Sequence, residues 1–252
     1  MRTDPSGDRP RKTPAKINAA SMPRKARQLQ VGDIVHVMNR GIEKRTIFLK
    51  NQDYSRFVLA LEFFNTKEEV NMWNLIARAG SVPARARLDK QRKKNKQCIV
   101  DLLAFTLMPN HYHLIVREMI NNGLALFMKK MGGYSTYFNK QYNRVGPLFQ
   151  SRYKTVIVND DIQLANVFSY VHTNPIELWE PAWKEYKIND ASRAMDRLEC
   201  YRWSSYRDYI GYSAFPYVTN RKFFQDFFGG LEFCKKTVED WVAFKTKSIG
   251  KV

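Results

Sequence analysis

The chain has 252 residues, of which 44% are hydrophobic and 13% aromatic, enough to form a buried core in one large domain or two small ones. Its 42 lysines and arginines against 24 aspartates and glutamates give a formal net charge of +18, which favours a polyanionic partner, nucleic acid first. Three widely spaced cysteines exclude a disulfide framework and a Cys-x-x-Cys zinc site, as is typical of a reducing cytoplasm. The sequence shows neither a membrane span nor a secretory signal, so we expect a cytoplasmic protein without a membrane partner.

Two segments are distinguished by their basic residues. Residues 1–30 hold eight basic residues, two acidic residues and four prolines, which predicts a disordered basic tail. Residues 85–96 hold seven basic residues against one acid, which predicts a solvated basic insertion. We therefore divide the chain into the tail 1–30, a main domain 31–178 that carries the insertion, and a C-terminal helical extension 179–252.

The first half of the main domain predicts a strand, a helix and two further strands. Alternation from Ile34 to Arg40 predicts a strand, and helical spacing after Asp53 predicts a helix that this carboxylate caps. Residues 98–107 and 111–117 are apolar stretches on either side of a Met-Pro-Asn turn, which predicts two antiparallel strands.

The second half predicts a helix, a strand and a last helix. The helical stripe of residues 124–138 is interrupted by two glycines, residues 148–158 are strand-like, and a helix runs from about residue 160 to Asn174, where Pro175 ends it. The order strand, helix, strand, strand, helix, strand predicts a ferredoxin-like α+β fold, an antiparallel sheet with helices on one face. The amphipathic segment 223–244 predicts a helical tail that covers the sheet.

His111 and His113 lie two residues apart on a predicted strand. Both imidazoles then project from one face while Tyr112 points to the other, a geometry that can hold a divalent metal. From the spacing alone, a packing or surface role for the pair stays open.

The sequence around these histidines resembles the REP-associated tyrosine transposases, which are IS200-like, single-tyrosine transposases of the HUH nuclease type. The resemblance runs in order from about residue 31 to 245, outside the basic tail and the insertion. The stretches that carry it are 37–41 (VMNRG), 108–116 (MPNHYHLIV), 146–154 (GPLFQSRYK), 170–176 (YVHTNPI) and 201–206 (YRWSSY).

The resemblance implies an HUH fold and a site of four residues. It makes His111 and His113 metal ligands, Asn174 the candidate third ligand and Tyr170 the nucleophile. Tyr170 and Asn174 are four residues apart on the predicted helix, so both can face one pocket. Because a residue before a proline disfavours helical geometry, the sequence does not fix the backbone conformation of Asn174. Two imidazoles, an amide oxygen and waters suit Mg²⁺ or Mn²⁺, since no thiolate is present.

DNA contacts are expected beside this site. Arg152 and Lys154 alternate onto one face of their predicted strand together with Gln150, so they can hold backbone phosphates or remain exposed without a ligand. Arg40, at the end of the first strand, is a further expected DNA contact. His172 is turned away from Tyr170 and is expected to be structural.

The resemblance implies an enzyme, a metal-dependent single-stranded DNA endonuclease and strand transferase. It would act on hairpin-forming DNA, such as REP-like palindromes, through a covalent 5′-phosphotyrosine, as a monomer or homodimer and without a small-molecule cofactor. One alternative is a non-catalytic nucleic-acid-binding regulator on the same fold. A rolling-circle replication initiator is a second, disfavoured because the sequence has no helicase-like phosphate loop.

Overall fold

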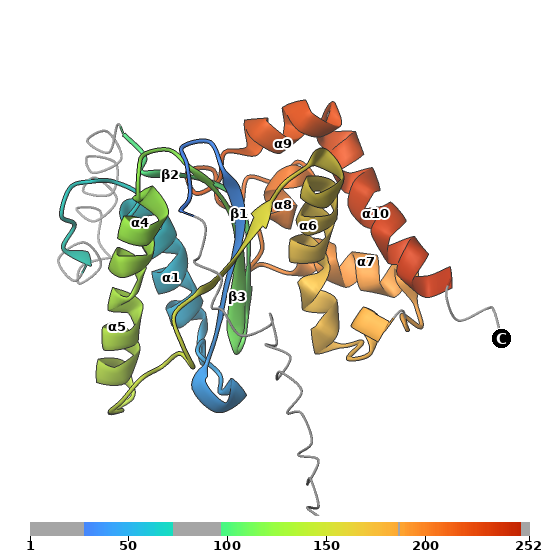
Figure 1. The fold of residues 1–252 in the computed structure, drawn as a ribbon. Coiled ribbons are helices and arrows are strands. Elements are labelled where there is room, and N and C mark those ends of the chain that lie inside the picture. The colour runs from blue at the N-terminus through green and yellow to red at the C-terminus, as the bar shows by residue number, and fades with distance from the viewer. Residues whose placement is uncertain (1–27, 73–96, 186, 248–252) are drawn as a thin grey trace, which may run out of the picture.

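The computed structural model describes residues 28–72, 97–185 and 187–247. Within these ranges the chain forms one four-stranded antiparallel sheet in the order β2-β3-β1-β4 (Figure 1). The strands are β1 (Ile34–Arg40), β2 (Val100–Met108), β3 (His111–Glu118) and β4 (Lys154–Val158). The predicted β1, β2 and β3 are confirmed with small differences at their ends.

The pleat of β3 sends its side chains alternately to two cores. Tyr112 and Leu114 belong to the core under the first layer of helices, whereas Ile115 belongs to the core on the opposite face. The tight turn at Pro109 and Asn110 sets this register, because it pairs Met108 directly with His111. A shift of one residue would exchange the two faces.

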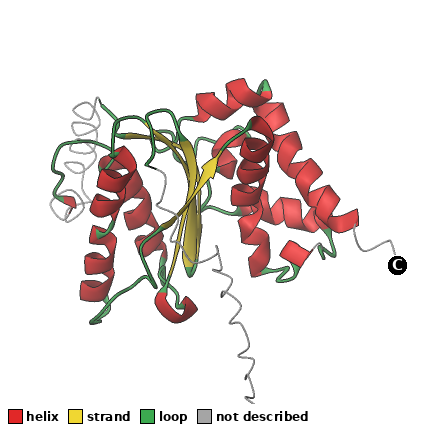
Figure 2. Cartoon of the chain, in the orientation of Figure 1, coloured by secondary structure: helices red, strands yellow, loops and turns green. Residues whose placement is uncertain are grey.

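Helices α1 (Asn51–Phe63), α4 (Gly123–Met131) and α5 (Gly133–Gln141) cover the first face (Figure 2). The sequence predicts α4 and α5 as one stripe interrupted by glycines, and the structure breaks the helix there. With these helices the chain follows the predicted ferredoxin-like element order, and the α+β class is confirmed.

The second face of the sheet is covered as well. Helix α6 (Asp161–Thr173) packs on β2 and β3, and α7 (Ala191–Cys200), α8 (Tyr206–Tyr209), α9 (Arg221–Phe228) and α10 (Leu231–Lys247) surround it (Figure 1). The helices therefore do not lie on one face only. Of the helical tail that was expected to cover the sheet, α9 contacts β2, whereas α10 packs on α6. One core holds side chains of α6 and of the extension together.

Two predicted elements are shorter than expected. The strand expected over residues 148–158 begins only at Lys154, because residues 148–153 follow a glycine with φ of +89° and their backbone forms one isolated bridge, Gly41 to Phe149, in place of a ladder. The helical tail is divided by Gly229 and Gly230, both at positive φ.

The basic insertion 85–96 and nearly all of the basic tail lie outside the described residues. No helix in the described ranges is both long and apolar enough to cross a membrane.

Candidate functional site

His111 and His113 project from the same face of β3, toward α6, as predicted. Their ring centroids are 5.0 Å apart with planes at 87°, and both side chains are buried. Tyr112 points to the opposite face and packs on Phe57. The antiparallel pleat alone produces this separation.

Helix α6 brings Tyr170 to these histidines. Asp160 caps its first turn by accepting a hydrogen bond from the backbone N–H of Gln163 at 2.7 Å, and the buried Leu164 and Phe168 hold the helix on the sheet. The Tyr170 ring then lies 5.4 Å from the His113 ring, nearly perpendicular to it. On its other side it stacks on Trp183 at 6.0 Å.

Asn174 keeps helical backbone geometry although a proline follows it. Its φ of −51° and ψ of −38° continue α6, and Pro175 lies in the first turn of the 3₁₀ helix Asn174–Leu178, where a proline is tolerated. The Asn174 amide nitrogen donates to the Tyr170 carbonyl at 3.3 Å. The Oδ1 of Asn174 is thereby directed at His111, so that Asn174, one helical turn after Tyr170, faces the same site.

The two nitrogens of His111 face different amides. Nδ1 lies 2.6 Å from Oδ1 of Asn110, and Nε2 lies 3.3 Å from Oδ1 of Asn174. A neutral imidazole carries only one N–H, so it donates to one of these oxygens. If the shorter contact carries the hydrogen bond, the Nε2 lone pair and the Asn174 oxygen converge on one position, as two ligands of a cation would.

His36 on β1 completes a cluster of three histidines. Its Nε2 lies 2.8 Å from Nδ1 of His113, the two rings are stacked at 5.0 Å, and its ring meets that of Tyr170 at 5.8 Å. The sequence analysis does not place His36 in the site. The signal is the strand pairing, since Met38 is opposite His113 and His36 is therefore its diagonal neighbour on the same face.

The histidines of the site are held uncharged. Burial lowers the pKa of His36 and of His111 to about 4, and the positive charge of Arg40 adds to the effect on His111. Burial, followed by the neighbouring histidines, lowers the pKa of His113 well below its usual value. Neutral imidazoles keep a lone pair, which metal coordination requires.

The donor atoms fit a divalent cation. Nε2 of His113 is buried with no hydrogen-bond partner, and such an atom lowers the stability of the folded chain unless another group binds it. Within the described ranges, no three His, Cys, Asp or Glu side chains are arranged so that all three could bind one metal ion, and the third histidine of the cluster, His36, is hydrogen-bonded to His113 instead. The available ligands are therefore the two Nε2 atoms, the Asn174 oxygen and waters.

His111, His113 and Tyr170 line a pocket of about 220 Å³. Its lining is made of Met38, Asn39, Arg40, His111, His113, Gln150, Ser151, Lys154 and Tyr170. Arg40 and Lys154 supply positive charge, and none of the lining residues is acidic. The pocket is thus suited to an anion such as a phosphodiester.

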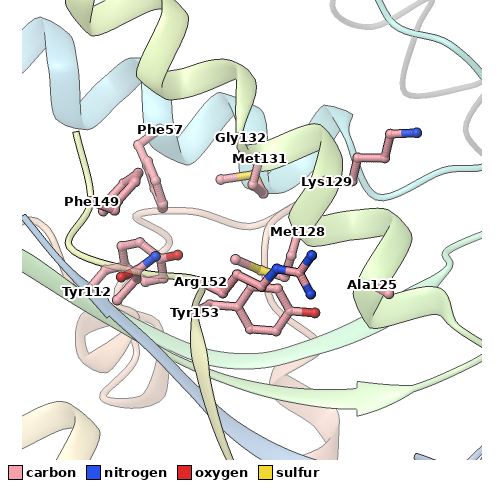
Figure 3. A pocket seen from close by; sticks show the side chains of 11 residues that line it. Phe57, Tyr112, Ala125, Met128, Lys129, Met131, Gly132, Phe149, Arg152 and Tyr153 are labelled. Atoms are coloured by element: carbon pink, nitrogen blue, oxygen red, sulfur yellow. The ribbon is translucent and has the colours of Figure 1, made fainter. Parts of the chain in front are cut away.

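Arg152 does not join Gln150 and Lys154. It precedes β4 and lines a different pocket of about 550 Å³ between the sheet and α4, together with Tyr153 and Phe149 (Figure 3). The prediction that Arg152 and Lys154 alternate on one strand face is wrong, because the strand begins only at Lys154.

His172 is structural, as expected, and it is joined to the 201–206 block. His172 is fully buried and its Nε2 shares a hydrogen bond with the Ser205 hydroxyl at 2.9 Å. Ser205 also hydrogen-bonds to the backbone of Phe105 on β2, so this contact ties α6 to the sheet.

Comparison with known proteins agrees with the resemblance found in the sequence. Residues 85–174 match the model of the family described as "Transposase IS200 like". That stretch contains both histidines of β3, Tyr170 and Asn174, and it also takes in the basic insertion. No curated protein matches the chain. A solved structure described as a REP-associated tyrosine transposase bound to a REP hairpin aligns with 79% of this chain and 94% of its own, at 11% identity and a TM-score of 0.46.

Proposed function

From the match of residues 85–174 to the IS200-like transposases, we propose that the protein cleaves and joins single-stranded DNA at hairpin-forming ends, with Tyr170 as nucleophile. The observation that carries this proposal is the position of Tyr170. Packing of α6 on the sheet brings its ring against His113 in a pocket whose charged residues are Arg40 and Lys154. One site thus holds a tyrosine that could act as nucleophile, histidines that could bind a metal, and basic side chains that could bind phosphate.

The reaction is a phosphoryl transfer to tyrosine. The Tyr170 hydroxyl oxygen forms a bond to the scissile phosphorus while the bond from phosphorus to the 3′ oxygen breaks. The phenolic proton passes to solvent, and the 3′ oxygen takes up a proton. The 5′ phosphate is then linked to Tyr170, and attack by another 3′ hydroxyl reverses the step and joins two ends without an external energy source.

The other site residues would bind the metal and the DNA backbone. His111, His113 and Asn174 would hold Mg²⁺ or Mn²⁺, which when bound polarises and orients the phosphate. Arg40 and Lys154 would hold the flanking backbone, and Gln150 would contact the strand beside them. Helix α6, which carries Tyr170 and ends at Asn174, packs on β2 and β3 of its own chain, so we infer that a monomer can form the site.

The first prediction tests the nucleophile. Tyr170→Phe should abolish the covalent adduct and leave hairpin binding within a few-fold, because the hydroxyl reacts but contributes little affinity. The measurement is a denaturing gel of hairpin-bearing single-stranded DNA, labelled on the 3′ side of the cleavage position and incubated with Mn²⁺.

Tyr153→Phe is the matched control, since Tyr153 lines the pocket on the other side of the sheet and should still form the adduct. EDTA should suppress the adduct in the parent. An adduct with Tyr170→Phe would mean that another tyrosine reacts. Tight hairpin binding with no adduct in the parent would instead support the non-catalytic regulator.

A further inference from the structure

His36 and His113 form a buried imidazole pair, of which the proposed reaction uses only His113. The Nε2 of His36 and the Nδ1 of His113 are 2.8 Å apart, and the rings stack with planes at 25°. Both side chains are at most 5% exposed. The pair therefore holds the His113 ring through Nδ1, whereas Nε2 of His113 takes no part in it.

The hydrogen bond in this pair decides which nitrogen of His113 carries the proton. If His113 donates from Nδ1, its Nε2 is a bare lone pair; if His36 donates, the proton of His113 sits on Nε2 and blocks coordination. Nε2 of His113 is buried without a partner, and an N–H there would be an unsatisfied donor. Donation from Nδ1 to His36 leaves that atom ready for a cation.

His111 shows a parallel arrangement. Its Nδ1 lies 2.6 Å from the Asn110 side-chain oxygen and its Nε2 lies 3.3 Å from the Asn174 side-chain oxygen. Both oxygens can only accept, so the shorter contact favours a proton on Nδ1, which leaves the Nε2 lone pair free beside Asn174. Both histidines of β3 thus have an acceptor at Nδ1 and direct Nε2 to the site. In metal proteins, such an acceptor fixes the tautomer and the ring orientation of the ligand.

We propose that His36 is a positioning residue that accepts a hydrogen bond from Nδ1 of His113 and thereby prepares Nε2 of His113 to bind a divalent cation. This role rests on the proposed function, because it assigns His113 as a ligand. It differs from simple packing in one respect: packing needs the ring of His36, whereas positioning needs its lone pair.

Two substitutions separate the ring from the lone pair. His36→Phe keeps an aromatic ring but removes the acceptor, and His36→Gln removes the ring but offers an amide oxygen. His172→Gln is the matched control, a buried histidine of α6 whose hydrogen bond goes to Ser205 and not to the site. Thermal unfolding in EDTA shows that each variant is folded before metal is added.

The first measurement is calorimetric titration of each metal-free protein with Mn²⁺. We expect His36→Phe to weaken Mn²⁺ binding by about 10- to 100-fold, and His36→Gln and His172→Gln to stay within a few-fold of the parent. Equal affinity of His36→Phe and the parent would overturn the role of His36 while leaving the metal site in place. A parent that binds no Mn²⁺ would overturn the metal in the proposed function as well.

The second measurement needs no metal and no activity. Nitrogen-15 shifts of the histidine rings in EDTA report the tautomer of His113, and we expect the proton on Nδ1 in the parent. In His36→Phe the proton should redistribute between the two nitrogens. A parent His113 protonated on Nε2 would overturn the proposal.

Discussion

Asp53 is the buried carboxylate that joins the start of α1 to α5. It accepts hydrogen bonds from the backbone N–H groups of Leu49 and Lys50 at 2.8 and 2.9 Å, and from the hydroxyls of Tyr137 and Tyr142 at 3.0 and 2.7 Å. The sequence predicts it as a helix cap, but it lies three residues inside the helix and caps from there. Tyr137 is buried in the first core and Tyr142 packs partly buried against it, so Asp53 ties both tyrosines to the start of α1.

We predict that Asp53→Ala lowers the free energy of unfolding by about 3 kcal/mol, because four donors lose one charged acceptor. Tyr142→Phe removes a single donor from the same carboxylate and should cost about 1 kcal/mol. Urea unfolding followed by circular dichroism measures both. Equal losses in the two variants would show that Asp53 does not unite this cluster.

His172 gives the stability of the fold a pH dependence. Burial lowers its pKa to about 3 from an ordinary 6.5, so the unfolded chain binds its proton first. Stability therefore falls as pH falls below about 6.5, and this histidine contributes about 1.4 kcal/mol per pH unit to that slope until its folded-state pKa is reached.

Replacement of this histidine should flatten the dependence. We expect the free energy of unfolding of His172→Gln, measured between pH 6 and 4 in EDTA, to change less steeply than that of the parent by about one proton equivalent. Parallel slopes would mean that His172 is already charged in the folded protein.

At the residue scale, the sequence identifies the side chains that lie next to each other in a motif but misses those joined by strand pairing. His111, His113, Tyr170 and Asn174 are read from two short stretches, and the structure brings them together. His36 is 77 residues from His113, and only the register of β1 on β3 makes them neighbours. No local pattern contains that register.

At the scale of elements, the clearest predictions are those in which the hydrophobic periodicity agrees with the residues that begin and end the element. Helix α6 has a capping aspartate at one end and a proline at the other, and its bounds follow. The segment before β4 is composed of strand-forming residues, but its backbone follows contacts with the end of β1. Gln150 donates its N–H to the Arg40 carbonyl, and Asn39 donates its amide to the Ser151 carbonyl. Such tertiary contacts override local propensity.

Helix α10 stabilises α6 and thereby the position of Tyr170. Val238 of α10 is fully buried in the core that it shares with Phe168 and Val171 of α6. Val238→Ala should lower the free energy of unfolding by roughly 2 kcal/mol, since it leaves a cavity in that core. Phe233→Ala on the same helix is the control, because Phe233 is 55% exposed and its loss should cost under about 0.5 kcal/mol.

Thermal or urea unfolding of the two variants decides this prediction. A negligible loss for Val238→Ala would mean that the C-terminal extension is only loosely attached to α6. The shared core argues for the opposite, and for an extension that is part of the main fold.

At the scale of the whole molecule, the net charge and the pocket have different roles in the proposed binding of DNA. In the proposed function, the net charge of +18 would attract any nucleic acid, whereas the pocket on the α6 face would select a phosphate position with Arg40, Lys154 and uncharged histidines. The sequence predicts the overall charge completely. It does not reveal that Arg152 belongs to the pocket on the opposite face, because that depends on where β4 begins.

The basic insertion 85–96, which lies outside the described residues, should add affinity for DNA without choosing its sequence. Neutralisation of phosphates by lysine and arginine contributes a salt slope of roughly 0.7 per contacted phosphate on single strands. Lys93→Ser with Lys94→Ser should therefore flatten the plot of log affinity against log salt concentration by up to about 1.4 units. The ratio of affinities for cognate and scrambled hairpins should stay nearly constant.

The matched control removes two lysines from the C-terminal helices. Lys222→Ser with Lys236→Ser takes away the same charge, but each of these lysines is paired with an aspartate one helical turn away. We expect no change in slope, because these two lysines lie outside the insertion and are already paired with aspartates, so they are not expected to contact DNA phosphates. An equal change in both double variants would show that only net charge counts. A collapse of the cognate-to-scrambled ratio in the first would instead place hairpin recognition in the insertion, since loss of nonspecific phosphate contacts weakens both hairpins alike.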